Sequence, residues 1–177
     1  RDEVRMQRLE ALHRLPELRL HLRRLRREEL IGDVELLAGS GADPAAGAAQ
    51  LNPLALAARP LQFWRWPDSP GQGAALYFVI DRPPHLAGPL LLYVGETGQA
   101  DRRWKGDHDC KRYLAAYGEA LRRAGLPMGL SIRFHCDVPQ AIGSRRAVEQ
   151  ALIRRWQPPF NKETRERWAT PFTADGD

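Results

Sequence analysis

Leu76-Tyr77-Phe78-Val79-Ile80 and Leu90-Leu91-Leu92-Tyr93-Val94 are the two stretches that decide the fold of this 177-residue chain. Each is a short, uninterrupted run of apolar and aromatic side chains, which is typical of a buried β-strand. The connection over residues 81–89 contains three prolines and a glycine and is too short for the crossover that parallel strands need. The two stretches therefore predict an antiparallel hairpin.

The chain after this hairpin predicts two helices. Gly95-Glu96-Thr97-Gly98 is typical of a turn, and it leads into a helix that should begin near Gln99 or Ala100. A second helix is expected over residues 110–124. Gly125 suits the left-handed position that follows the last turn of such a helix.

The last part of the chain predicts a strand followed by a helix. Residues 130–134 alternate between apolar and polar side chains, so we expect a half-buried third strand. Ser144 is expected to cap a final helix that runs to about Trp156. Pro158-Pro159 cannot continue that helix. The predicted order of elements is β-β-α-α-β-α.

The first fifty residues differ in composition from the rest. Leucines recur at helical spacing over residues 1–37, with arginines and glutamates between them. Such a segment can pack its leucines on the main domain or on a partner, or it can place a basic face on DNA. The Ala- and Gly-rich residues 39–53 indicate a linker. We predict a helical extension and linker over residues 1–50, suited to homodimer or partner contacts, and a main domain over residues 51–177.

Composition and charge argue against a membrane-spanning chain and favour a polyanionic partner. The sequence is 43% hydrophobic and 28% charged, and no apolar run approaches the roughly 18 residues that a membrane span needs. The net charge of +5 suits a nucleic acid. Cys110 and Cys136 form no CxxC pattern, so we expect reduced thiols in a cytoplasmic protein.

Tyr77 and Tyr93 are the first candidates for chemistry. They lie in the two hairpin strands, so their hydroxyl groups can converge on one sheet face. A phenol with an ordinary pKa of about 10 is a poor base unless a cation lies nearby. Arg103 is a suitable cation, because a guanidinium and a helix N-terminus both favour a phosphate. His108 follows in the next loop, where an imidazole can shuttle a proton or hydrogen-bond the phosphate.

Glu149 is the candidate metal ligand. It falls beside the apolar face of the last helix, which aims a carboxylate into a cleft bordering the core. One carboxylate, with waters and substrate oxygens, is enough to hold Mg²⁺. The alternative is an exposed helix charge that pairs with Arg145 or Arg146.

The two tyrosines and their neighbours resemble the GIY-YIG nuclease family. Ala75-Leu76-Tyr77 stands where that family has Gly-Ile-Tyr, and Tyr93-Val94-Gly95 closely matches its second tripeptide. The resemblance covers about residues 70–163. It implies an α+β fold in which helices flank a small three-stranded antiparallel sheet.

The remaining family positions are also occupied. Arg103 lies at the family arginine's distance from the second tyrosine, Glu149 corresponds to the metal-binding glutamate, and Asn161 corresponds to the terminal asparagine. His108 matches a histidine found in a subset that includes some restriction enzymes. By this resemblance Arg103 would contact the phosphoryl oxygens, Glu149 would hold one Mg²⁺ or Mn²⁺ ion, and Asn161 would orient site groups by hydrogen bonding.

The resemblance implies a metal-dependent endonuclease that hydrolyses DNA phosphodiester bonds, in repair, recombination or defence. Tyr77 would be the general base, assisted by His108, and Tyr93 would position the nucleophile or the phosphate. RNA is left open as a further substrate. The alternatives are a nucleic-acid-binding module that does not cut, and a domain that cuts only after its N-terminal helices recruit a partner.

Overall fold

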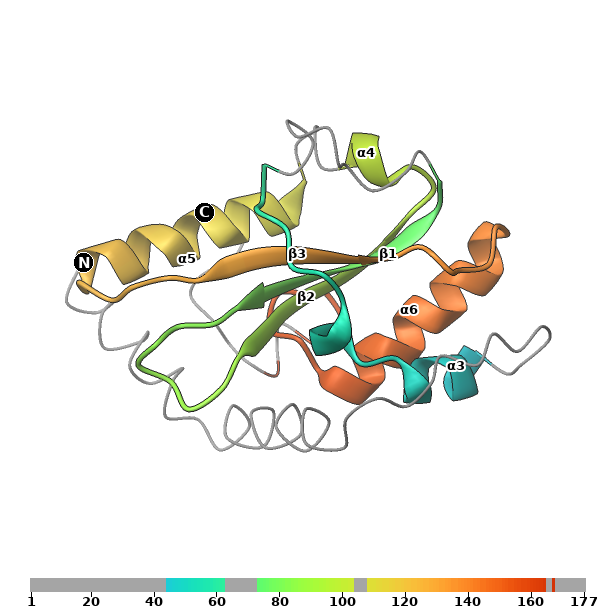
Figure 1. Ribbon diagram of the computed structural model, residues 1–177, viewed down its shortest axis with the longest axis horizontal. Coiled ribbons are helices and arrows are strands. Elements are labelled where there is room, and N and C mark those ends of the chain that lie inside the picture. The colour runs from blue at the N-terminus through green and yellow to red at the C-terminus, as the bar shows by residue number, and fades with distance from the viewer. Residues whose placement is uncertain (1–43, 63–72, 104–107, 165–166, 168–177) are drawn as a thin grey trace.

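The computed structural model describes residues 44–62, 73–103, 108–164 and 167 (Figure 1). The helices predicted over residues 1–37 lie outside these ranges. The described part is an α+β fold built on one open antiparallel sheet. Among its residues no helix has the length and apolar character that a membrane crossing requires. Cys110 and Cys136 form no disulfide with each other in the described residues.

The sheet has three strands, in the order β2-β1-β3. They span Ala75–Asp81 (β1), Leu90–Thr97 (β2) and Leu130–His135 (β3), and both strand pairs are antiparallel. The predicted hairpin is therefore confirmed. β2 is longer than predicted, because residues 95–97 continue to pair with the start of β1 where the sequence indicated a turn.

Helices cover both faces of the sheet, which explains why every residue of β1 is buried. One face packs on α5 (Asp109–Arg123), and the other packs on α6 (Ile142–Trp156) and α3 (Pro44–Gln50), as Figure 1 shows. Tyr77 and Val79 enter the α5 side of the core, whereas Leu76, Phe78 and Ile80 enter the α6 side. The short helix α4 (Ala100–Arg103) follows β2, as expected.

The ends of the two long helices differ in how well the sequence predicted them. After α5, Gly125 has the expected positive φ of 65°. The amide of Gly125 donates to Arg122 and that of Leu126 to Leu121, which closes the helix with a Schellman motif. The capping role predicted for Ser144 is wrong, since α6 begins at Ile142 and its N-cap residue is Ala141.

The linker interpretation is wrong for residues 44–50. They form α3, which packs against α6. Ala48 and Leu51 are buried in the core on that side of the sheet, and the Arg155 guanidinium donates to the carbonyls of Ala48 and Ala49. Within α3, Ala48 is buried in this contact, whereas Ala46 and Ala49 are exposed. The domain boundary near residue 50 stays a prediction.

The outer edge of β3 is also covered by a preceding segment. Arg59 exchanges two backbone hydrogen bonds of 2.9 Å with Ile132. Arg133, expected on a solvent-facing side of the strand, is only 5% exposed. Its guanidinium donates to the carbonyls of Pro53 and Leu56 at 3.3 and 3.1 Å, and also to Leu54. The half-buried strand was thus an incomplete prediction, because residues 53–59 cover its polar side.

Candidate active site

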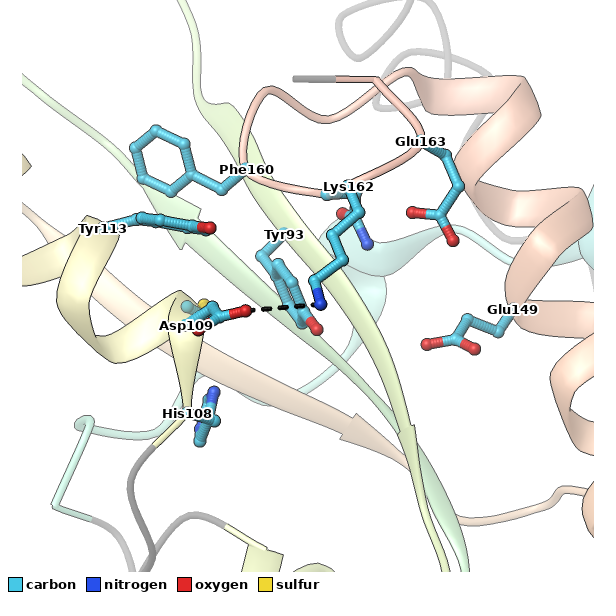
Figure 2. Close-up of a pocket in the computed structure, with 10 residues that line it drawn as sticks. Tyr93, His108, Asp109, Tyr113, Glu149, Phe160, Lys162 and Glu163 are labelled. Atoms are coloured by element: carbon cyan, nitrogen blue, oxygen red, sulfur yellow. Dashed lines mark ion pairs between the residues drawn. The ribbon is translucent and has the colours of Figure 1, made fainter. Parts of the chain in front are cut away.

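One pocket of about 230 Å³ brings together four of the six candidate residues. Tyr93 lies on β2, and His108 immediately precedes α5. Glu149 lies on α6, and Asn161 lies in the loop after α6. Figure 2 shows the Glu149 carboxylate pointing towards Tyr93 in the middle of the pocket. Residues far apart in sequence therefore meet at the point where β2, α5 and α6 come together.

Tyr77 lies beneath this pocket and is not among the described residues that line it. Its side chain is 1% exposed, and its ring stacks on Tyr93 with centroids 5.9 Å apart and planes 26° apart. The ring also covers Gly95, its partner in the β1–β2 pairing. A Cβ at residue 95 would lie 2.3 Å from Tyr77 Cζ. Gly95 is thus needed to accommodate the Tyr77 ring.

Tyr93 is the tyrosine that reaches the pocket. Burial raises the pKa of Tyr93 well above its ordinary value, and the neighbouring Tyr77 and Cys110 add to this rise. The phenol therefore keeps its proton at neutral pH. In this environment Tyr93 is suited to donate a hydrogen bond and is a poor proton acceptor.

Asn161 fixes the loop after α6 to β2. Its Nδ2 donates to the Val94 carbonyl at 2.7 Å, and its Oδ1 accepts from the Val94 amide at 2.9 Å. The Phe160 amide donates to the Leu92 carbonyl at 3.0 Å. These bonds cover the outer edge of β2 on both sides of Tyr93. Asn161 is 3% exposed, so its hydrogen bonds orient the strand that carries Tyr93.

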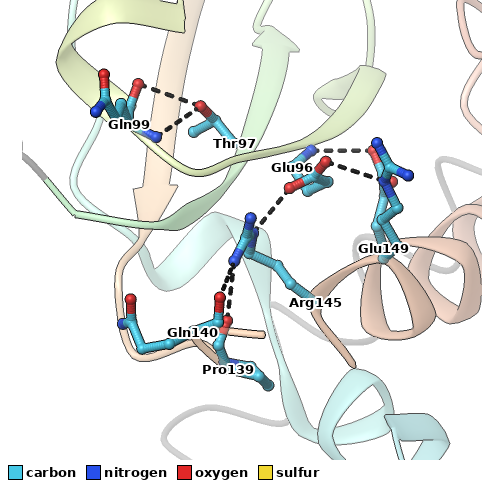
Figure 3. Close-up of polar contacts among 8 residues, drawn as sticks. Glu96, Thr97, Gln99, Pro139, Gln140, Arg145 and Glu149 are labelled. Carbon is cyan, nitrogen blue, oxygen red and sulfur yellow. Dashed lines mark hydrogen bonds and ion pairs between the residues drawn. The ribbon is translucent and has the colours of Figure 1, made fainter. Parts of the chain in front are cut away.

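Glu149 is half-buried, and one of its carboxylate oxygens accepts a hydrogen bond of 3.0 Å from the Glu96 amide (Figure 3). Burial raises the pKa of Glu149 to about 7, and the Glu96 carboxylate adds to the rise. The hydrogen bond from the Glu96 amide opposes it. Burial destabilises the charged form of this carboxyl group, and a bound cation would stabilise that form. The environment of Glu149 therefore suits a metal ligand.

The sequence left open a pairing of Glu149 with Arg145 or Arg146, but in the structure both arginines pair with Glu96. Arg145 Nε lies 2.8 Å from Glu96 Oε2, and Arg146 Nε lies 3.3 Å from Glu96 Oε1. Both α6 arginines therefore pair with a residue of β2. Sequence reasoning missed Glu96, which it placed in a turn.

Three further charged residues line the pocket and were also missed: Asp109, Lys162 and Glu163. Lys162 Nζ lies 3.5 Å from Asp109 Oδ2, joining the start of α5 to the loop after α6. The hydrogen bond from Arg112, with a smaller effect from Lys162, lowers the pKa of Asp109. The signal for these residues was adjacency, since Asp109 follows His108, and Lys162 and Glu163 follow Asn161.

The donor set limits the kind of cation that can bind. Among the residues that the structure describes, no three His, Cys, Asp or Glu side chains are grouped to hold a metal ion. A single carboxylate such as Glu149 is compatible with Mg²⁺ or Mn²⁺, because these ions keep several waters and take oxygen ligands from the substrate. The backbone of Arg103 ends α4, and the position of its side chain lies outside what the structure describes.

Comparisons with protein-family models, curated proteins and solved structures return no match for this chain. The resemblance to GIY-YIG nucleases therefore stays a prediction that rests on the sequence motifs.

Proposed function

We propose that this chain is a divalent-cation-dependent endonuclease that hydrolyses DNA phosphodiester bonds. The observation that carries the proposal is the shared pocket of Tyr93, His108, Glu149 and Asn161. It combines a hydrogen-bond donor, an imidazole and a half-buried carboxylate. These are the groups that hydrolysis of a phosphodiester can use.

Each residue has a proposed role that follows from its surroundings. Glu149 would hold the cation, and a bound Mg²⁺ or Mn²⁺ supplies charge stabilisation to a phosphoryl oxygen. Tyr93, which keeps its proton, would donate a hydrogen bond to the phosphate or the attacking water. His108 would accept the proton of that water, since imidazole exchanges protons readily near neutral pH. Arg103 would stabilise negative charge on the phosphoryl group.

The role proposed for Tyr77 changes with its burial. A side chain that is 1% exposed has no direct access to a substrate in the pocket. We therefore propose that Tyr77 supports the Tyr93 ring by stacking and that His108 takes the place of general base. Asn161 acts in the same supporting way, through the backbone of Val94.

Charge supports a nucleic acid as the substrate class. The chain carries a net charge of +5, which attracts a polyanion. Two exposed cations, Arg112 and Lys162, lie beside the pocket and share Asp109 as their partner. An exposed pair of this kind is weak, so a phosphate can replace the carboxylate at little cost.

Incubation of the purified protein with supercoiled plasmid and Mg²⁺ or Mn²⁺ tests the proposal. We expect nicking that stops with a chelator and is lost in Glu149→Gln and His108→Ala. The control is Glu119→Gln, which changes an α5 carboxylate whose side chain is 38% exposed and which pairs with Arg122 and Arg123. This variant should cut normally.

Binding of plasmid without nicking by the wild type would contradict the enzyme and favour the binding module. Nicking that requires a cell fraction in addition to the cation would favour the partner-recruited domain. An unchanged rate in Glu149→Gln would remove this residue from the proposed chemistry.

A further inference from the structure

Arg145 and Arg146 lie about one helical turn before Glu149 in α6, where opposite charges on a helix normally pair. The structure directs both arginines to a different carboxylate. Arg145 Nε donates to Glu96 Oε2 at 2.8 Å, and Arg146 Nε donates to Glu96 Oε1 at 3.3 Å. Figure 3 shows Glu96 between the Arg145 side chain and the part of α6 that carries Glu149.

The Arg145–Glu96 pair lies inside the protein. The side chains of Arg145 and Glu96 are 4% and 13% exposed. Arg145 Nη1 also donates to the carbonyls of Pro139 and Gln140, at 3.1 and 2.9 Å. A guanidinium this deeply buried needs an anionic partner, because a buried charge without one is strongly destabilising. Glu149 lies four residues after Arg145 in α6, at the spacing at which opposite charges on a helix pair, so it is the candidate substitute for Glu96.

Glu96 also contacts Glu149 directly, through its backbone. The Glu96 amide donates to Glu149 Oε1 at 3.0 Å. The side chain of this residue therefore binds the two arginines while its main chain holds the carboxylate that they would otherwise approach.

We infer that Glu96 is a positioning residue for the cation site: it binds the guanidinium groups of Arg145 and Arg146, so that neither hydrogen-bonds to Glu149 and the Glu149 carboxylate remains available to a divalent cation. An arginine paired with Glu149 would neutralise the carboxylate and occupy its oxygens. This inference takes one thing from the proposed function, namely that the ligand of Glu149 is a cation.

A crystal structure of Glu96→Ala tests the arrangement without any cation. We expect a guanidinium nitrogen of Arg145 or Arg146 within hydrogen-bonding distance of a Glu149 oxygen. If this variant does not fold, Glu96→Gln replaces it, since the amide keeps the shape of the side chain without its charge. A structure in which both arginines stay away from Glu149 would overturn the inference.

Titration of the protein with Mn²⁺, followed by the electron paramagnetic resonance signal of the free ion, tests the consequence. We expect Glu96→Ala to weaken Mn²⁺ binding by about tenfold, as loss of a residue that orients a metal ligand typically does. Added to the wild type, Arg146→Gln should change the Mn²⁺ affinity by less than about twofold. Added to Glu96→Ala, it should raise the weakened Mn²⁺ affinity several-fold. Equal effects of Arg146→Gln in both backgrounds would show that this arginine acts only by long-range repulsion of the cation and would overturn the inference.

Arg133→Met is the matched control. Arg133 is also buried, at 5% exposure, and it also binds backbone carbonyls, but those of Pro53, Leu54 and Leu56. Its loss should lower stability and leave Mn²⁺ affinity unchanged. Mn²⁺ binding that is equally weak in Arg133→Met and Glu96→Ala would show a general loss of structure and contradict a positioning role.

Failure of the proposed function looks different from failure of this inference. If the wild type binds no Mn²⁺, or if Glu149→Gln binds it equally well, then Glu149 is not a cation ligand. The crystal structure of Glu96→Ala would still decide whether Glu96 holds the arginines away from Glu149.

Discussion

Asp81 and Glu149 are carboxylates at opposite ends of the sheet, and burial raises the pKa of both. Asp81 ends β1 and is fully buried; it accepts hydrogen bonds of 2.7 Å from the Tyr117 hydroxyl and the Gly129 amide. Glu149 lies beside Glu96, which pairs with Leu76 near the start of β1. It opens onto the pocket.

The carboxylates at these two ends differ in how they are held. Tyr117 lies on α5 and Gly129 immediately precedes β3, so Asp81 joins three parts of the core. Glu149 has a single backbone donor, and the nearby arginines pair with Glu96. A buried carboxylate with strong donors stabilises a fold, whereas one that is held beside a cavity is suited to bind a ligand.

The largest expected effect is on catalysis at the Glu149 end. Glu149→Gln should lower the rate of plasmid nicking by about 100-fold or more, since charge stabilisation by the cation is worth several kcal/mol. Asp81→Asn should keep most of the activity at a temperature where it is folded. Quantitative nicking assays at saturating Mg²⁺ measure both, and comparable losses would remove the distinction between the two ends.

The next effect is on stability at the Asp81 end. Asp81→Ala leaves the Tyr117 hydroxyl and the Gly129 amide without their acceptor, which should cost about 2–4 kcal/mol of unfolding free energy. Urea unfolding measures the loss. Asp137→Ala, which changes an exposed carboxylate, should change that free energy by less than about 0.5 kcal/mol. A cost below 1 kcal/mol for Asp81→Ala would contradict the structural role.

The pH dependence of the unfolding free energy should reveal the raised pKa of Glu149. Its folded pKa of about 7 lies above the ordinary value of 4.5, so the unfolded chain loses this proton first as the pH rises. The wild type should therefore lose stability between about pH 4.5 and 7, by roughly 1–2 kcal/mol after allowance for solvent screening. Glu149→Gln should lack this loss, and its stability relative to the wild type should rise over that window.

Metal-free urea unfolding at pH 4 and pH 8 measures this difference. Asp81 titrates in both proteins and cancels in the comparison. A constant difference between the two proteins across the window would show that the Glu149 pKa is not raised.

The smallest expected effect is on DNA binding, and it should differ between arginines at the two ends of α5. Arg112 pairs with Asp109 at 2.7 Å beside the pocket, and Arg122 pairs with Glu119 at 2.8 Å near the other end of the helix. Both guanidinium groups are largely exposed, at 67% and 72%. Arg112→Gln should lower the salt dependence of DNA binding by about one phosphate contact. Arg122→Gln should leave it unchanged.

Fluorescence anisotropy over a range of salt concentrations measures both slopes. Equal slopes in the two variants would mean that DNA does not reach the pocket end of α5.

Local sequence patterns predicted most of the fold. The two apolar runs predicted the hairpin, and Gly125 predicted the end of α5 because few other residues adopt a positive φ. The errors occurred where distant residues changed the local environment. Residues 95–97 stayed in β2 because β1 pairs with them, and residues 44–50 became helical against α6.

Motif spacing predicted that Tyr93, His108, Glu149 and Asn161 belong to one site, and the structure places these four around one pocket. The motif spacing did not distinguish the buried Tyr77 from the pocket-facing Tyr93, because both lie on the same side of the sheet. The strand order covers Tyr77, which lies on the central strand with the Tyr93 and Phe134 rings on either side.

The sequence by itself predicted the two hairpin strands, the third strand and the two long helices, since these elements depend on neighbours along the chain. Only the tertiary structure decided which charges pair around Glu149. Helical spacing favoured Glu149 as the partner of Arg145 and Arg146, yet the register of β2 brought Glu96 to them. A charge pairs according to distance and burial in space, and the packing of α6 against β2 sets both.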